Sequence, residues 1–381
     1  MTSPLFSPVT LGAVSLANRI VVAPMCQYSA DDGSATDWHL QHLGSLALSG
    51  AALLMIEATA VERNGRITHG CLGLYSDANE AALGRVLALL RKIGCHAKLG
   101  IQLAHAGRKG STQRPWEGGQ ALKPEAGAYP TVAPSALPFD ASWHTPAQLD
   151  AAGMGRIKDA FVSAARRAAR LGLDAVELHA AHGYLLQEFF SPLANRREDA
   201  YGGDLEGRMR FPLEIAAAVR EVWPQARMLG ARISGSDWLE GGATTDDAVA
   251  LARRLKALGF DYVCVSSGGV VPKAVPKPLV PGYQVPFAAR VRKEAGIATR
   301  AVGMIVHPRQ AEDIIASGQA DMVALARGFL DDPRWVWHAA QALGVEIAYP
   351  PQYGRAHPKA WPGAELVRPP LTEAKTAALG G

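Results

Sequence analysis

The stretch RIKDAFVSAARRAARLGLDAVELHAA, residues 156–181, contains the pattern that decides the fold. From Arg156 to Leu171, apolar residues recur at helical spacing, with Arg and Lys on the opposite face. Gly172 then ends the helix and leads into the aliphatic run from Asp174 to Ala181, which has the length of a buried parallel strand. The stretch therefore predicts one helix–strand unit of an α/β protein.

The same unit repeats along the whole chain, because eight short aliphatic or β-branched runs alternate with longer amphipathic segments. The runs are residues 18–25, 52–59, 98–105, 174–181, 228–234, 262–268, 299–304 and 321–328. Alternation alone does not distinguish a closed barrel from an open, doubly wound sheet. Eight units in 381 residues is the usual count of a (β/α)8 barrel, so the sequence predicts a single TIM-barrel domain over residues 1–381.

Two segments depart from this repeat. Residues 6–19, within an N-terminal segment 1–19, predict a small hairpin that we expect to plug the bottom of the barrel. Residues 107–145 are rich in Pro, Gly and Trp and form a long excursion after the third strand. In a barrel such an excursion lies on the C-terminal face, where long loops usually cover a site.

The composition argues against several classes of function. Lys and Arg outnumber Asp and Glu by only 39 to 35 and form no run, so nucleic-acid binding is unsupported. No apolar run approaches the roughly 20 residues needed to span a bilayer, and the N-terminus lacks the pattern of a signal peptide. We therefore expect a soluble, cytoplasmic protein without membrane contact. The cysteines have no Cys-x-x-Cys spacing, which gives no disulfide framework and no zinc or iron–sulfur cluster; they are Cys26, Cys71, Cys95 and Cys264.

Polar side chains stand at the carboxyl end of nearly every predicted strand. In a (β/α)8 barrel these ends meet on one face, which carries the active site. One or two such residues would be unremarkable in a core, but a polar group from nearly every strand indicates a common ligand. The residues are Cys26, Gln27, Tyr28, Glu57, Thr59, Gln102, His105, Glu177, His179, His182, Tyr184, Arg232, Ser266, Ser267 and Arg327.

Five motifs at these positions resemble those of the old yellow enzyme family of FMN-dependent ene reductases. They are Ala-Pro-Met-Cys-Gln-Tyr at 23–28, Glu-Ala-Thr-Ala at 57–60, His-Ala-Gly-Arg-Lys at 105–109, His-Ala-Ala-His-Gly-Tyr-Leu-Leu-Gln-Glu-Phe at 179–189, and Tyr-Gly-Gly at 201–203 followed by Arg208. Cys26, Tyr28 and the short barrel are similar to the bacterial subclass typified by xenobiotic and thermostable ene reductases. The resemblance implies non-covalent FMN, NADPH or alternatively NADH as the reductant, and reduction of the C=C bond of α,β-unsaturated carbonyl compounds.

The resemblance assigns Gln102 and Arg232 to the pyrimidine edge of the flavin, and their chemistry agrees. A guanidinium there stabilises the anionic reduced flavin by about 1.5–3 kcal/mol, although a plain salt-bridge role for Arg232 is the alternative. Ala326 and Arg327 would hold the phosphate after the last two strands. The family more often has glycine before this arginine, so the site requires Ala326 to keep a negative φ. The other positions implied to bind the flavin are Ala23, Pro24, Met25, Cys26, Ala58 and Gly303.

His179 and His182 lie three residues apart just past a strand, so a turn brings both imidazoles toward one point. Two N–H donors on a carbonyl oxygen would polarise an enone and stabilise the enolate-like charge. Tyr184 is then the natural proton donor to Cα, an effect on the order of 100- to 10,000-fold, with a structural tyrosine as the alternative. The His-x-x-His spacing also suits a metal pair. A metal-dependent barrel hydrolase using both histidines and Glu57 is therefore the rival function.

The resemblance gives three further residues a place around the substrate. Cys26 would touch the substrate and tune the flavin potential without acting as a nucleophile, and Tyr28 would hydrogen-bond the ligand. Lys109 either approaches the site or is solvated. In the C-terminal segment 345–381, Gln-Tyr-Gly-Arg at 352–355 resembles a segment whose arginine reaches the neighbouring subunit's site. Arg355 therefore implies a homodimer or homotetramer, and no residue is assigned to a metal.

Overall fold

The computed structural model describes residues 3–272 and 279–367, and it contains a closed barrel of eight parallel strands. The strands follow one another around the barrel in chain order, and β12 pairs with β3 to close it. They are β3 (Ile20–Val22), β4 (Leu53–Ala60), β5 (Lys98–Ala104), β8 (Ala175–Ala180), β9 (Met228–Ser234), β10 (Tyr262–Ser266), β11 (Ala298–Ala301) and β12 (Met322–Leu325). The predicted (β/α)8 barrel is confirmed, and the open doubly wound sheet is excluded.

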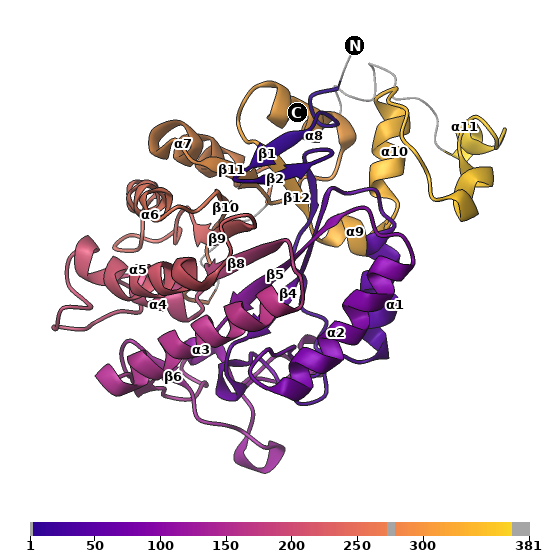
Figure 1. Cartoon of the computed structure of the whole chain (residues 1–381). Coiled ribbons are helices and arrows are strands. Elements are labelled where there is room, and N and C mark those ends of the chain that lie inside the picture. The colour runs from indigo at the N-terminus through magenta and orange to yellow at the C-terminus, as the bar shows by residue number, and fades with distance from the viewer. Residues whose placement is uncertain (1–2, 273–278, 368–381) are drawn as a thin grey trace.

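Helices surround the barrel, between successive strands and after β12 (Figure 1). They are α1 (Asp37–Ala47), α2 (Asp77–Lys92), α3 (Ala151–Arg170), α4 (Leu185–Phe190), α5 (Leu205–Val222), α6 (Thr245–Ala257), α7 (Val285–Ala295), α8 (Pro308–Ala316), α9 (Arg327–Asp331) and α10 (Trp335–Ala342). The stretch quoted first forms most of α3 and all of β8. The Asp150 side chain caps α3 by accepting from the Gly153 N–H, and Gly172 has φ +69 just after the helix.

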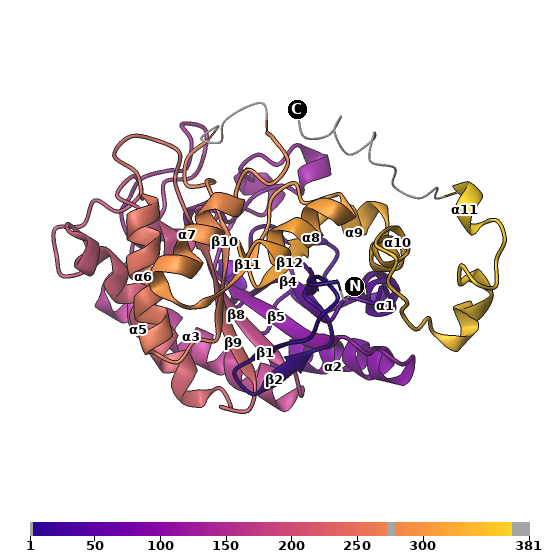
Figure 2. The same ribbon diagram turned by 90° about the horizontal axis from the view of Figure 1, so that it is seen from above.

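The N-terminal hairpin consists of β1 (Val9–Leu11) and β2 (Val14–Leu16), which pair antiparallel. Its buried side chains share one cluster with Met228 and Met322, which begin β9 and β12. The hairpin therefore closes the end of the barrel where the strands begin, as predicted, and it lies at the lower edge of the barrel in Figure 2. Residues 1–2 of the predicted segment lie outside the described residues.

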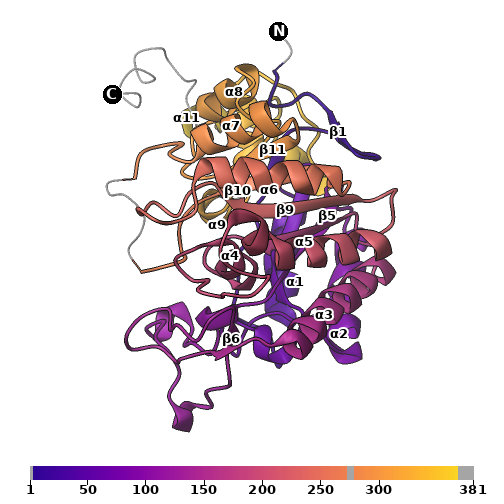
Figure 3. The same ribbon diagram turned by 90° about the vertical axis from the view of Figure 1, so that its left-hand side faces the viewer.

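The excursion after β5 is anchored at the opposite end. It contains η2 (Gly107–Lys109), η3 (Pro115–Glu117), η4 (Pro124–Ala126) and β6 (Val132–Ala133), which pairs with β7 (Ala147–Gln148). Figure 3 shows the segment around β6 projecting beyond the barrel. Arg108 donates to the Val270 carbonyl at 2.7 Å, and Lys109 donates to the Gly269 carbonyl at 2.9 Å. Both carbonyls follow β10, so the excursion begins at the C-terminal face, as predicted.

After α10 the chain leaves the barrel. This segment contains η5 (Pro351–Ala356) and α11 (Ala364–Val367), and Figures 1 and 2 both show it projecting on the side of α10. Its base is held by aromatic contacts: the Trp337 ring stacks on Tyr349 with centroids 4.1 Å apart. The predicted C-terminal segment 345–381 is described only to residue 367. Within the described residues, no helix is long and apolar enough to cross a membrane.

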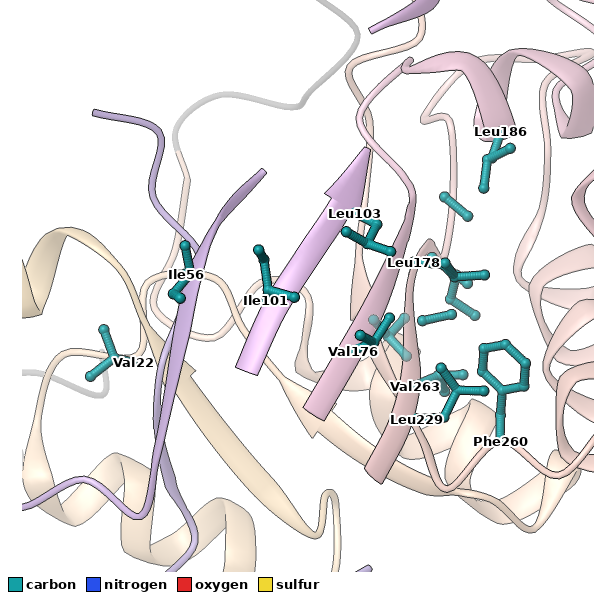
Figure 4. Close-up of a cluster of buried hydrophobic side chains, with 14 of the residues drawn as sticks. Val22, Ile56, Ile101, Leu103, Val176, Leu178, Leu186, Leu229, Phe260 and Val263 are labelled. Atoms are coloured by element: carbon teal, nitrogen blue, oxygen red, sulfur yellow. The ribbon is translucent and has the colours of Figure 1, made fainter. Parts of the chain in front are cut away.

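The main apolar core lies between the barrel and its helices, and a second apolar cluster fills the barrel interior next to the hairpin, so the polar groups stand toward the other end of the interior. Val176 and Leu178 of β8 are fully buried in this core, beside Ile101 and Leu103 of β5 (Figure 4). Since side chains alternate along a strand, the residues between and after them on β8 point inward. Glu177 and His179 occupy those inward positions, and this alternation is what places the site.

Three strands end clearly earlier than predicted, because the run 18–25 extends beyond β3 and the last two runs extend beyond their strands. The runs 299–304 and 321–328 are longer than β11 and β12 because the chain turns away from the sheet while its composition stays aliphatic. Gly303 and Met304 have φ of +110 and +49, and Arg327 already belongs to α9. Apolar composition does not mark the point at which a chain leaves a sheet.

Candidate active site

The ends of β8 and β9 bring the predicted catalytic residues together. The His179 ring centroid lies 5.1 Å from that of His182 and 4.9 Å from that of Tyr184. The strand register places Arg232 of β9 directly beside His179. The four side chains therefore lie at one end of the barrel. We call His179, His182 and Tyr184 the proposed catalytic cluster, and Arg232 is the cation beside it.

A left-handed turn after β8 makes this cluster possible. His182 and Gly183 have φ of +60 and +72, and the turn leads into α4, for which Tyr184 is the N-cap residue. A side chain at Gly183 would overlap the Gly269 carbonyl, so only glycine fits there. Holding a residue such as His182 in this conformation costs roughly 1–3 kcal/mol. The Lys109 ammonium helps to hold it by donating to the His182 carbonyl at 2.7 Å.

Both histidines are neutral. Burial lowers the pKa of His179 and of His182 well below the usual value, and the positive charges of Arg232 and Lys109 lower both pKa values further. Nδ1 of His179 accepts from the Ala181 N–H at 3.3 Å, so the proton of this ring lies on Nε2. Since Nε2 bonds to no residue that the structure describes, His179 presents a free N–H donor.

His182 differs because its N–H is already in use. Its Nε2 lies 2.7 Å from Oγ of Ser266, and that hydroxyl donates to Oε1 of Gln284 at 3.2 Å. Oε1 of Gln284 also accepts from the Ser267 hydroxyl at 2.6 Å. We assign the single proton of Ser266 to Gln284, so that the Ser266 hydroxyl accepts from His182. The two histidines therefore differ as donors to a ligand. The N–H of His179 is free, whereas His182 must break its hydrogen bond to Ser266 before this N–H can reach a ligand.

Tyr184 keeps its phenolic proton because burial raises its pKa, as do the neighbouring Cys26 and Cys71. The Lys109 Nζ lies 5.1 Å from the Tyr184 ring centroid, and burial lowers the pKa of this lysine to about 8. Lys109 therefore lies beside the cluster and is not a solvated surface lysine. Glu188 accepts from the N–H of Arg108, the residue before Lys109, and burial raises the pKa of this carboxyl to about 8.

Cys26 and Tyr28 approach from the end of β3. Burial and then the charge of Glu57 raise the pKa of the Cys26 thiol well above its usual value, so Cys26 is a thiol and not a nucleophilic thiolate. Tyr28 has φ +51, and its ring meets Trp116 of the excursion with centroids 6.0 Å apart. Burial raises the pKa of Tyr28, and Cys26 and Tyr184 are near enough to add to this effect, which indicates that the three groups are close.

The residues expected to hold FMN offer the groups that this cofactor needs. Arg232 is 9% exposed, and its Nε has no hydrogen-bond partner among the described residues. A buried donor without a partner indicates a ligand acceptor, which the carbonyl groups of a flavin ring supply. Gln102 is buried between Ala58 and Glu177 in the strand register. Arg232 forms no salt bridge within the described residues, which disfavours the plain salt-bridge alternative.

The positions implied for the phosphate are at the ends of β11 and β12. Ala326 has φ −108, the negative value that the site requires, and Arg327 is exposed. Arg327 and Arg232 both lower the pKa of Tyr283, which burial raises, so their charges act on a common neighbour. A side chain at Gly303 would overlap the Gln284 amide. Ala23, followed by Pro24 and Met25, donates its N–H to the Leu325 carbonyl at 2.9 Å, which places these three beside the end of β12.

Arg355 is not part of this cluster. It is exposed on η5, in the segment that projects from the barrel. Its place in a neighbouring subunit's site stays a prediction.

A buried ionic network inside the barrel was not anticipated from the sequence. Glu177 accepts a hydrogen bond from the Tyr262 hydroxyl at 2.9 Å and pairs with Arg300, and none of the three is exposed. The sequence signal for this network was Arg300 itself, a charged residue inside the predicted buried strand 299–304.

The rival metal site lacks a ligand set. Among the residues the structure describes, no three His, Cys, Asp or Glu side chains are placed to share an ion. Glu57, the third ligand of the hydrolase alternative, instead accepts from the Gln27 N–H at 3.1 Å and lies 3.3 Å from Nε2 of His39.

Comparison with known proteins defines the class as the flavin oxidoreductases. Residues 4–346 match the model of the NADH:flavin oxidoreductase / NADH oxidase family. The chain belongs to this family, which includes the old yellow enzymes, and its cofactor is FMN.

Relatives cover nearly the whole chain. It is 45% identical over 357 residues to an NADPH dehydrogenase of Geobacillus sp. (strain WCH70) and 43% identical over 356 residues to one of Listeria innocua serovar 6a; each alignment covers 93% of this chain and 99% of the relative. Morphinone reductase superposes with a TM-score of 0.75 at 28% identity, over 92% of this chain and 93% of that one. 2-Naphthoyl-CoA reductase, at 22% identity and a TM-score of 0.79 over 90% of this chain and 52% of its own, shares the fold.

Proposed function

We propose that this protein is an ene reductase that uses NADPH, or alternatively NADH, to reduce the C=C bond of α,β-unsaturated carbonyl compounds. The observation that carries the proposal is the free Nε2–H of His179 beside the protonated phenol of Tyr184. The relatives named NADPH dehydrogenase support the nicotinamide as reductant. When bound, FMN supplies the hydride chemistry between the nicotinamide and Cβ of the substrate.

The histidines bind and polarise the substrate carbonyl. His179 donates its Nε2–H to the carbonyl oxygen, and His182 becomes the second donor once it releases Ser266. Because both rings are neutral, they stabilise negative charge on that oxygen by hydrogen bonds and do not protonate it. Loss of one such donor typically slows a reaction by about 100- to 1,000-fold.

Tyr184 protonates Cα. Its raised pKa keeps the proton on the phenol until the substrate carbanion demands it. The nearby Lys109 ammonium favours the phenolate that remains, because an adjacent positive charge stabilises an anion.

The remaining assignments belong to the same proposal. Cys26 and Tyr28 line the substrate position, and Arg355 enters the site of a neighbouring subunit. We propose that residues 1–381 form one FMN-binding domain, with the segment 345–381 at the interface of a cytoplasmic homodimer or homotetramer.

Tyr184→Phe tests the proposal through the two half-reactions, followed separately by stopped-flow absorbance of the flavin. Reoxidation by 2-cyclohexenone should slow by about 100- to 10,000-fold, while reduction by NADPH stays as in the wild type. Tyr201→Phe is the matched control, since the Tyr201 hydroxyl contacts Glu214 at 3.3 Å, away from the cluster. Equal losses in both half-reactions would remove the proton-donor role.

A further inference from the structure

We propose that Glu177 is a positioning residue that fixes which end of the Gln102 amide faces the cofactor. The inference rests on the proposed contact between Gln102 and the pyrimidine edge of FMN. The oxygen and the NH2 group of an amide have nearly the same shape, so packing alone does not choose between its two orientations. The choice depends on the partner that the amide meets inside the barrel.

The partner of Gln102 is a carboxylate. Nε2 of Gln102 lies 2.8 Å from Oε1 of Glu177, and both side chains are buried. This is the hydrogen bond that the Gln102 side chain makes with the described residues, and its Oε1 accepts none from them. The two residues are neighbours on β5 and β8, so the strand register itself sets the contact.

The rest of the network sets Glu177 against a permanent positive charge. Its Oε2 pairs with Arg300 and accepts from the Tyr262 hydroxyl at 2.9 Å. Arg300 is fully buried and permanently charged, so it needs a counter-charge at this position. An ionised carboxylate has no hydrogen to donate. The Gln102 NH2 group must therefore face Glu177, which leaves the amide oxygen as an acceptor for the cofactor.

This orientation matches the chemistry of the flavin. The pyrimidine ring of FMN carries an imide, with one N–H between two carbonyl groups. An acceptor at Gln102 suits that N–H, whereas Arg232 can only donate and suits a carbonyl. With the amide inverted, two donors would oppose each other. Glu177 thus acts on the cofactor through Gln102 without touching it.

Glu177→Gln should invert the amide through a relay. Arg300 can only donate and requires an acceptor, so the amide introduced by this substitution would turn its oxygen toward Arg300 and its NH2 group toward Gln102. Gln102 would then turn its oxygen inward and present NH2 to the imide N–H. Burying two opposed donors is costly, and the affinity for FMN should fall roughly 10- to 100-fold.

The experiment measures FMN dissociation constants by quenching of flavin fluorescence as apoprotein is added. Glu177→Gln is compared with the wild type, with Gln102→Leu and with the double variant. If Glu177 acts through Gln102, Glu177→Gln should change the affinity by less than about twofold in the Gln102→Leu background. Equal fold-losses in both backgrounds would overturn the proposal, as would a folded Glu177→Gln protein that binds FMN like the wild type.

A second pair of measurements guards against a variant that fails to fold. Glu177→Gln with Arg300→Met removes both buried charges, a change that folds often tolerate, and it removes the group that drives the relay. This protein should recover FMN affinity to within a few-fold of the wild type; an affinity as weak as that of Glu177→Gln alone overturns the relay. Wild-type protein should also bind FMN methylated at the imide nitrogen at least about 10-fold more weakly than FMN, and equal affinity overturns the acceptor assignment. Enone turnover enters none of these readouts, so an error in the proposed reaction would be seen separately, in the half-reactions.

Discussion

Replacing Ser266 by Ala is expected to strengthen the binding of a phenolate, which mimics the enolate formed on the substrate. The reason is the inequality of the two histidines. The N–H of His179 is free, whereas that of His182 must first leave Ser266 Oγ, 2.7 Å away. Ser266→Ala removes that competitor and leaves the N–H of His182 for the ligand.

The magnitudes follow from the bonds exchanged. A hydrogen bond to a charged oxygen contributes about 1.5–3 kcal/mol and one between neutral groups about 0.5–1.5 kcal/mol. His179→Ala should therefore weaken phenolate binding by about 10- to 150-fold. His182→Ala should weaken binding less, typically by about 10-fold or less. The reason is that the bond from His182 to the phenolate replaces its bond to Ser266, so only the difference between the two bond energies is lost. Ser266→Ala should tighten binding by about 2- to 10-fold.

The assay is an absorbance titration of the oxidised holoprotein with 4-hydroxybenzaldehyde, at a pH where this phenol is ionised. His179→Asn serves as the matched control, because Asn retains an N–H donor and should recover part of the loss. Unfolding temperatures confirm that each variant is folded. Weaker binding by Ser266→Ala, or a larger loss in His182→Ala than in His179→Ala, would refute the reasoning.

Three further predictions concern the cofactor, the buried carboxyl and the projecting segment. Arg232→Met should weaken FMN binding by about 10- to 150-fold, measured by titration of the apoprotein. It should also raise the pKa of His179 in an NMR titration, because a neighbouring cation is lost. The control is Arg292→Met, which removes a surface pair with Asp321 and should change neither quantity. Burial raises the pKa of Glu188 from 4.5 to about 8, so its contribution to the free energy of unfolding is fully present below pH 4.5 and is lost as the pH rises to about 8. Between about pH 5.5 and about pH 8, urea unfolding should show that the wild type loses about 3 kcal/mol of stability relative to Glu188→Gln. Parallel pH profiles of the two proteins would contradict the assignment. Arg355→Ala should raise the KM for the enone while FMN affinity stays unchanged, and a monomer in analytical ultracentrifugation would refute its place in a neighbouring site.

The barrel was predictable because local rules alone determine its units. In residues 156–181 an amphipathic face, a glycine after the helix and an aliphatic run each act within a few residues, and α3 and β8 formed where these rules placed them. The convergence of His179, Tyr184 and Arg232 was predictable for a geometric reason, since the carboxyl ends of parallel strands in a closed barrel meet on one face.

The pairing of side chains across the barrel was not predictable in this way. His182 and Ser266 are 84 positions apart, and Glu177 and Arg300 are 123 positions apart. Which inward side chains meet depends on strand register and tilt, and no pattern within one strand encodes either. The early ends of β11 and β12 were missed for a related reason, because a turn away from the sheet left the aliphatic composition unchanged.

The N-terminal hairpin has a kinetic consequence. Its leucine and valine side chains fill the mouth of the barrel where the strands begin, so among the residues that the structure describes the opposite mouth is the one left for access to the flavin. In the proposed ene reductase, the nicotinamide and the enone share this mouth. If each must leave before the other binds, the expected kinetics are ping-pong, with inhibition by an excess of either reactant.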